Sequence, residues 1–120
     1  MREANPAQTV KKFNQYINEG NLEGLTSLMT EGHTFIDSQG KVNMESVWRD
    51  FFTAYPNYEN HFKRVGELVN TVILHGYSTC SNEPALEGPA IWTAKVQGGL
   101  VAEWRVYEDT KENRKKLELV

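Results

Sequence analysis

The chain has 120 residues, of which 13 are basic and 16 acidic, and its net charge is −3. This length predicts a single domain, residues 1–120, and the charge gives no basic surface for nucleic acid. The apolar runs are too short to span a membrane, and the first residues lack the apolar stretch of a secretory signal. Cys80 is the one cysteine, so neither an intramolecular disulfide nor a thiolate metal cluster can form. We therefore expect a cytoplasmic protein.

Two short amphipathic helices are predicted in the first third of the chain. The first begins at Asn5-Pro6, a capping residue followed by proline, and ends at Gly20. Asn21 caps the second helix, which is predicted to extend to Gly32. Apolar residues at helical spacing form one face of each helix: Val10, Phe13 and Ile17 in the first, and Leu22, Leu25, Leu28 and Met29 in the second.

A short strand, a turn and a third helix are predicted next. His33–Asp37 has the pattern of a strand, and Ser38-Gln39-Gly40 that of a turn. Asn43 is predicted to cap the third helix, which ends before Pro56. The apolar face of this helix is wide and strongly aromatic: Met44, Val47, Trp48, Phe51, Phe52 and Tyr55.

The second half of the chain has the pattern of a meander of four strands. Gly98-Gly99 predicts a hairpin turn, because both glycines accept positive φ. The predicted strands are Val65–Asn70, Thr71–Cys80, Ala90–Gln97 and Leu100–Glu108. Alternation along the last two predicts an apolar face with Trp92, Ala94, Val96, Leu100, Ala102, Trp104 and Val106, and a wetter face with Thr93, Lys95, Gln97, Glu103 and Arg105.

This order of elements predicts an α+β fold, in which three N-terminal helices pack on a curved, mostly antiparallel sheet. Such a sheet, covered by helices, forms a cone with an internal pocket at its wide end. The wetter face, with Arg105 and Tyr107, suits the interface of a homodimer. The charged run Lys111–Lys116 is typical of a solvated end. Residues 110–120 are predicted to be a tail that is either mobile or folded over the mouth of the pocket.

Asp37 stands where the first strand meets its turn, and two interpretations of this carboxylate remain open. It could line the pocket as a general base, or it could be a turn residue, since Asp-Ser-x-Gly is an ordinary turn sequence. His75 and Tyr77 lie in a strand whose two faces are both mixed, so alternation does not decide whether they line the pocket. Tyr16, one turn from Phe13, is a third acid–base candidate, with simple packing as the alternative.

The wall of the pocket is predicted to be aromatic, and its members are equally typical of a core: Phe13, Trp48, Phe52, Tyr55, Tyr77, Trp92 and Trp104. The three histidines have no metal-ligand spacing, and the chain has no glycine-rich phosphate loop. Neither a metal nor a cofactor is predicted.

Three segments carry a resemblance to a known superfamily. They are the predicted helix–helix corner Asn18–Leu25, the strand and turn Thr34–Gly40, and Glu103–Asp109 with its Trp-Arg-x-Tyr-x-Asp run. Their order resembles the nuclear transport factor 2-like superfamily, and within it the SnoaL-like and ketosteroid-isomerase-like proteins. The resemblance covers the chain from about Asn5 to Asp109.

The resemblance implies roles for three residues. Asp37 falls at the position of the general base of ketosteroid isomerases, Phe13 at that of a tyrosine oxyanion donor, and Trp92 near that of a protonated aspartate. Phenylalanine cannot donate a hydrogen bond, and tryptophan offers one indole N–H.

Two functions follow from this resemblance. One is a cofactor-free acid–base enzyme of the isomerase, cyclase or dehydratase type that binds a small hydrophobic molecule. Its donor would be Trp92, Tyr16 or His75. The alternative is a non-catalytic ligand-binding or dimerisation module.

Overall fold

The computed structural model describes residues 6–37, 40, 42–44, 46–68, 70–81 and 83–117. Within these residues, six strands form one sheet in the order β2-β1-β6-β5-β4-β3, where β1 and β6 are parallel and all other neighbours antiparallel. The strands are β1 Met29–Ile36, β2 Val42–Met44, β3 Tyr58–Leu68, β4 Thr71–Cys80, β5 Gly88–Gln97 and β6 Leu100–Glu108. The predicted cap at Asn5, the turn residues Ser38 and Gln39 and the tail residues 118–120 lie outside the described residues.

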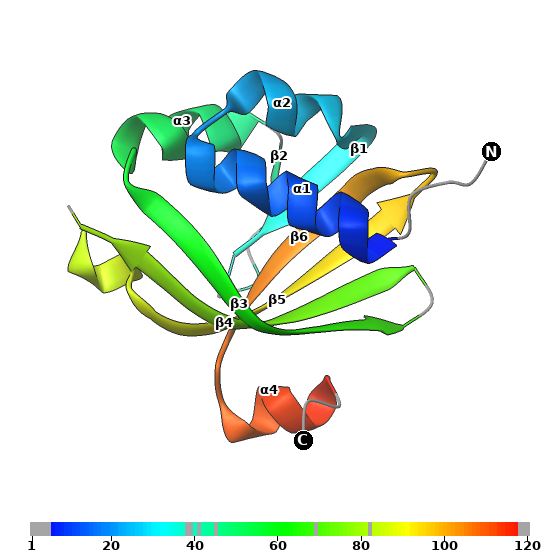
Figure 1. Cartoon of the computed structure of the whole chain (residues 1–120), viewed down its shortest axis with the longest axis vertical. Helices are drawn as coiled ribbons and strands as arrows, with labels where there is room; N and C mark the ends of the chain where they lie inside the picture. Colours follow the sequence, from blue (N-terminus) through cyan, green and yellow to red (C-terminus); the bar gives the residue numbers. More distant parts are fainter. Residues whose placement is uncertain are drawn as a thin grey trace.

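The helices lie on both sides of this sheet (Figure 1). Helices α1, α2 and α3 are above it in this view, whereas α4 is below it. Helix α1 packs along the sheet against β3 to β6, and α2 packs mainly against α1. The helices are α1 Pro6–Glu19, α2 Leu22–Ser27, α3 Ser46–Ala54 and α4 Lys111–Lys116, with a 3-10 turn η1 over Pro84–Leu86. The predicted α+β class is confirmed.

The core lies between α1 and the inner face of the sheet. Val10, Phe13 and Ile17 of α1 are at most 1% exposed, as their helical spacing predicts. Opposite them, Leu74, Trp92, Ala94 and Trp104 of the central strands are equally buried. Burial of this apolar area is the main term that stabilises the fold.

Several local predictions are confirmed. Asn21 caps α2 by accepting a hydrogen bond from the Gly24 N–H at 2.9 Å. Strands β4 and β6 have the predicted bounds. Gly98 and Gly99 turn between β5 and β6 with φ of 57° and 79°, which explains why both are glycines.

Other boundaries were predicted wrongly. Helix α2 ends at Ser27, and Gly32 lies inside β1. Asn43 lies in strand β2, paired with Phe35, and not at the cap of α3. Strand β3 begins at Tyr58, seven residues before the predicted start at Val65.

A bulge changes which residues of β6 face the core. The β5–β6 register shifts between Lys95 and Val96, so that Val96 pairs with Val101 whereas Lys95 pairs with Glu103. Val101 is therefore in the core, in place of the predicted Leu100 and Ala102.

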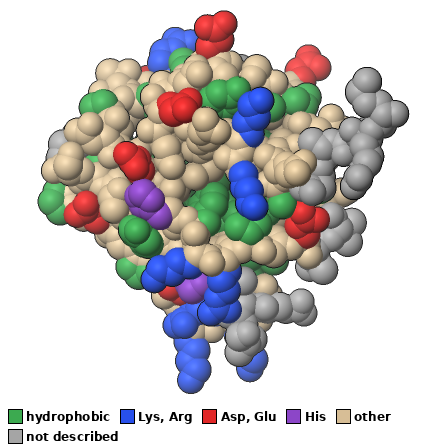
Figure 2. All heavy atoms as spheres, viewed as in Figure 1, with side chains coloured by type: hydrophobic (Ala, Val, Ile, Leu, Met, Phe, Trp, Pro, Cys, Tyr) green, Lys and Arg blue, Asp and Glu red, His purple; other side chains and the backbone are tan. Residues whose placement is uncertain are grey.

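The predicted tail contains a helix. Thr110 caps α4 by accepting a hydrogen bond from the Asn113 N–H at 3.0 Å. Figure 2 shows basic side chains gathered over this helix, whose last turn carries Arg114, Lys115 and Lys116. Because α4 lies on the side of the sheet away from α1, it does not cover the inner face.

Candidate ligand-binding site

A cavity of about 480 Å³ opens between the inner face of the sheet and α3. A volume of this size suits a small molecule. Five elements contribute aromatic rings to its wall: Phe35, Trp48, Phe51, Tyr58, Trp92, Trp104 and Tyr107. Ring pairs hold this wall in place; for example, Phe35 meets Trp48 edge-on with centroids 4.9 Å apart, and Phe51 meets Tyr58 at 4.8 Å.

Asp37 brings a carboxylate to this aromatic cavity. It directly follows β1, is half-buried and is among the lining residues. Its backbone carbonyl also accepts a hydrogen bond from the Gly40 N–H at 2.9 Å, and Gly40 has φ of 84°. Asp37 therefore belongs both to a turn and to the cavity wall. Its role as a base stays a prediction.

The indole of Trp92 is a buried donor at the same cavity. Trp92 lies on the inner face of β5 and is fully buried, with its ring against Phe62 at a centroid distance of 5.4 Å. Its Nε1 has no hydrogen-bond partner among the described residues. A buried N–H without a partner is costly, and a ligand acceptor that reached it from the cavity would relieve that cost.

Trp48 provides the contrast, because its indole is satisfied. Its Nε1 donates to His33 Nε2 at 3.3 Å, and His33 Nδ1 bonds the Val101 carbonyl at 2.8 Å. Since a carbonyl only accepts, Nδ1 carries the imidazole proton and Nε2 accepts. His33 is thus a buried structural residue that holds α3 to the sheet.

Tyr58 contributes a neutral hydroxyl to the wall. Burial raises the pKa of Tyr58 to about 12, while its hydrogen bond with the Ser78 side chain acts in the opposite direction and nearby Cys80 adds slightly to the rise. Ser78, which also lines the cavity, donates from Oγ to the Leu86 carbonyl at 2.5 Å. Neither side chain adds charge beside Asp37 near neutral pH.

No family model matches this chain, and no curated protein matches it either. Solved structures do match. An NTF2-like protein of unknown function from Cytophaga hutchinsonii has a TM-score of 0.75 at 14% identity, over 98% of this chain and 97% of that one. A putative SnoaL-like polyketide cyclase from Shewanella putrefaciens has a TM-score of 0.74 at 12% identity, over 96% of this chain and 86% of that one. An M. tuberculosis LEH-like epoxide hydrolase has a TM-score of 0.76 at 13% identity, over 87% of this chain and 78% of that one. The chain has the nuclear transport factor 2-like fold.

The other two acid–base candidates lie away from the cavity of this nuclear transport factor 2-like fold. His75 is on the outer face of β4, where its Nε2 is 3.0 Å from Asp109 Oδ2. Asp109 in turn pairs with Arg114 of α4, Oδ1 to Nε at 3.0 Å. Tyr16 lies beside α2, with its ring close to Gly24. The structure therefore does not bring His75 or Tyr16 together with Asp37.

The predicted wall residues divide into two groups. Trp48, Trp92 and Trp104 line the cavity. The other four are outside its lining: Phe13 is a core residue against Trp104 at 5.2 Å, Phe52 and Tyr55 pack on Phe51, and Tyr77 is 39% exposed on the outer face, stacked with His61 at 4.9 Å.

Sequence reasoning missed six polar residues of the wall, which include two carboxylates besides Asp37: Tyr58, Asn60, Ser78, Glu87, Tyr107 and Glu108. Tyr58 and Asn60 alternate on one face of β3, in a part of the strand where polar residues hid the β pattern. Among the described residues, no group of three or more His, Cys, Asp or Glu side chains could hold a metal ion. Within the same ranges, every helix is too short or too polar to cross a membrane.

Proposed function

We propose that the protein binds a small, largely apolar carbonyl compound in this cavity and that Asp37 removes a proton from the carbon beside the carbonyl. The proton moves from that carbon to a carboxylate oxygen, and the electron pair passes to the carbonyl oxygen as an enolate. The Trp92 N–H donates a hydrogen bond to this oxygen. Return of the proton to another carbon would give isomerisation, and attack of the enolate on a second carbonyl would give cyclisation.

The observation that carries this proposal is the indole N–H of Trp92. It is buried beside the cavity that Asp37 lines and has no hydrogen-bond partner within the described part of the chain. A donor that is already in place and desolvated stabilises a developing oxyanion without reorganisation. The aromatic wall favours a mostly apolar ligand. Because Phe13 has no donor and the Tyr58 hydroxyl already bonds the Ser78 side chain, Trp92 is the donor that the geometry supports best.

Exchange of the α protons of 2-tetralone in D₂O tests this chemistry directly, since proton NMR follows each loss of signal. We expect the wild-type protein to accelerate the exchange and Asp37→Asn to slow it by at least about 100-fold. Asp50→Asn, on the exposed face of α3, is the matched control and should leave the rate unchanged. Trp92→Phe should reduce the rate on the order of 100-fold. An unchanged rate in Asp37→Asn would remove this carboxylate from the mechanism.

A second function, non-catalytic ligand binding, is favoured by the positions of His75 and Tyr16, because neither lines the cavity as a further acid–base group. On this alternative, 2-tetralone would bind the protein with no exchange above the buffer rate. The predicted homodimer is compatible with both functions. Sedimentation at micromolar concentration tests it independently of the cavity.

A further inference from the structure

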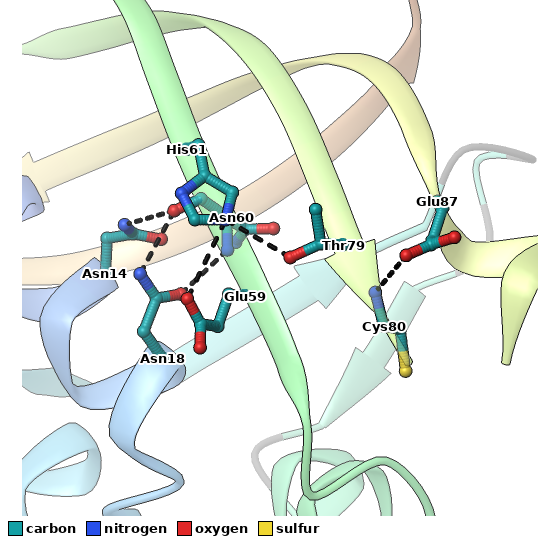
Figure 3. Close-up of polar contacts among 8 residues, drawn as sticks. All are labelled: Asn14, Asn18, Glu59, Asn60, His61, Thr79, Cys80 and Glu87. Carbon is teal, nitrogen blue, oxygen red and sulfur yellow. Dashed lines mark hydrogen bonds and ion pairs between the residues drawn. The ribbon is translucent and has the colours of Figure 1, made fainter. Parts of the chain in front are cut away.

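Two asparagines of α1 hold the backbone of β3 at the edge of the sheet (Figure 3). The Asn60 N–H donates to Asn18 Oδ1 at 2.7 Å, and the Asn60 carbonyl accepts from Asn18 Nδ2 at 3.0 Å and from Asn14 Nδ2 at 3.3 Å. Because β3 is the outermost of the described strands, these backbone groups face none of the other five on that side. The Asn18 carboxamide takes the place of a neighbouring strand.

Hydrogen bonds, in addition to packing, hold the backbone of Asn60 in place. Three hydrogen bonds to its own peptide groups set the position of its Cα relative to α1. Its side chain belongs to the cavity wall, together with Tyr58 two residues earlier. Asn60 is 3% exposed, and its Oδ1 has no hydrogen-bond partner among the described residues. A buried amide oxygen without a partner is costly, and a ligand O–H or N–H that reached it from the cavity would relieve that cost.

We infer that Asn60 Oδ1 selects ligands that carry a hydroxyl or N–H group, and that Asn18 and Asn14 are positioning residues that aim it. This inference rests on the proposed function only in placing the ligand in the same cavity, and it needs no catalysis. Asn60 thus supplies an acceptor, whereas Trp92 supplies a donor. A ligand that satisfies both carries an acceptor and a donor on one apolar frame.

A matched pair of probes tests the acceptor. 2-Naphthol and 2-methoxynaphthalene share one ring system, but only the first can donate a hydrogen bond. We expect the wild-type protein to bind 2-naphthol about 5-fold more tightly, the effect of one such bond, as measured by NMR titration. The ratio of the two dissociation constants is taken on a single protein sample. A variant that is partly unfolded weakens both values alike and leaves the ratio intact.

Five variants test which residue causes this preference. Asn60→Leu, close in size to asparagine, should abolish it, with Asn60→Ala as a second replacement. Asn18→Ala should reduce the preference while 2-methoxynaphthalene still binds, because the acceptor is present but no longer aimed. Gln15→Ala, an exposed amide on the same helix that bonds Glu19, is the matched control and should keep it. Asp37→Asn should also keep it, because the hydroxyl donates to Asn60.

The outcomes separate this inference from the proposed function. Equal binding of the two probes by the wild-type protein, binding of neither, or a preference that survives Asn60→Leu overturns the role of Asn60. A preference that disappears in Asp37→Asn does the same, since the carboxylate would then be the acceptor. A protein that shows the preference but does not exchange the protons of 2-tetralone refutes proton abstraction alone.

Discussion

Gly76 of β4 lies where a side chain would meet the backbone of β3. A Cβ atom at this position would be 1.9 Å from the backbone oxygen of His61 and 2.9 Å from the Phe62 Cα. Gly76 pairs with Phe62, next to the register shift between Phe62 and Arg64. Strand β3 is strongly bent (Figure 1), and the missing side chain of Gly76 leaves room for that bend. We therefore expect Gly76→Ala to be strongly destabilising.

The size of this destabilisation follows from the contact that the new Cβ atom would make. The distance of 1.9 Å is about 1.5 Å short of the 3.4 Å at which ordinary contacts begin, and the obstacle is backbone that no rotamer change can move. Separating the strands by this amount breaks about two backbone hydrogen bonds, at about 1 kcal/mol each. Strain in a packed region adds a further ~1 kcal/mol or more. We expect a loss of about 3 kcal/mol, or about 12 °C in Tm for a domain of this size.

Urea denaturation followed by tryptophan fluorescence measures this loss. Gly66→Ala is the matched control, because Gly66 also lies in a strand, on β3, and a Cβ there would meet nothing within 4 Å. We expect the control to differ from the wild type by less than about 0.5 kcal/mol. If Gly76→Ala were as stable as Gly66→Ala, the close approach of β3 and β4 would not exist in solution.

Two further predictions concern groups outside the proposed chemistry. Because burial raises the pKa of Tyr58 from 10.0 to about 12, the unfolded chain loses this proton first as the pH rises. The stability that Tyr58 contributes is present below pH 10, and about 2 kcal/mol of it is lost between pH 10 and 12. Tyr58→Phe should remove this part of the pH dependence of the free energy of unfolding, as measured by urea titration at each pH. Asp109→Ala removes the partner of His75 and Arg114, so trypsin should cleave within Lys111–Lys116 severalfold faster. Unchanged cleavage would show that this contact does not hold α4.

Elements governed by local pattern could be predicted from the sequence. The helical spacing of Val10, Phe13 and Ile17, the cap at Asn21 and the glycine turn at 98–99 act within a few residues, and the structure has all of them. Met29 shows where this reasoning fails. Its spacing continues the apolar stripe of α2, but it pairs with Val101 in the sheet. Pairing with a strand so distant in sequence overrides local propensity.

The candidate site was predictable to a similar degree. Asp37 and three of the tryptophans were placed by strand and helix patterns, and they line the cavity. The position of His75 was not decidable, because its partner on the outer face, Asp109, is distant in sequence and is itself paired with Arg114 of α4. Asn60 was missed because its role depends on side chains of α1, a contact that no local pattern encodes.

The parallel pairing of β1 with β6 has a consequence for how this chain folds. Among the described strands, β1 and β2 join the rest of the sheet through β6, which spans Leu100–Glu108. A nascent chain that has emerged only as far as β5 therefore holds two unconnected sheet fragments and lacks the cavity-lining residues of β6. Such distant pairing must await the last strand, which slows folding and exposes the edges of β1 and β5 in the meantime. We therefore expect the cavity to be completed only once β6 has paired with both β1 and β5.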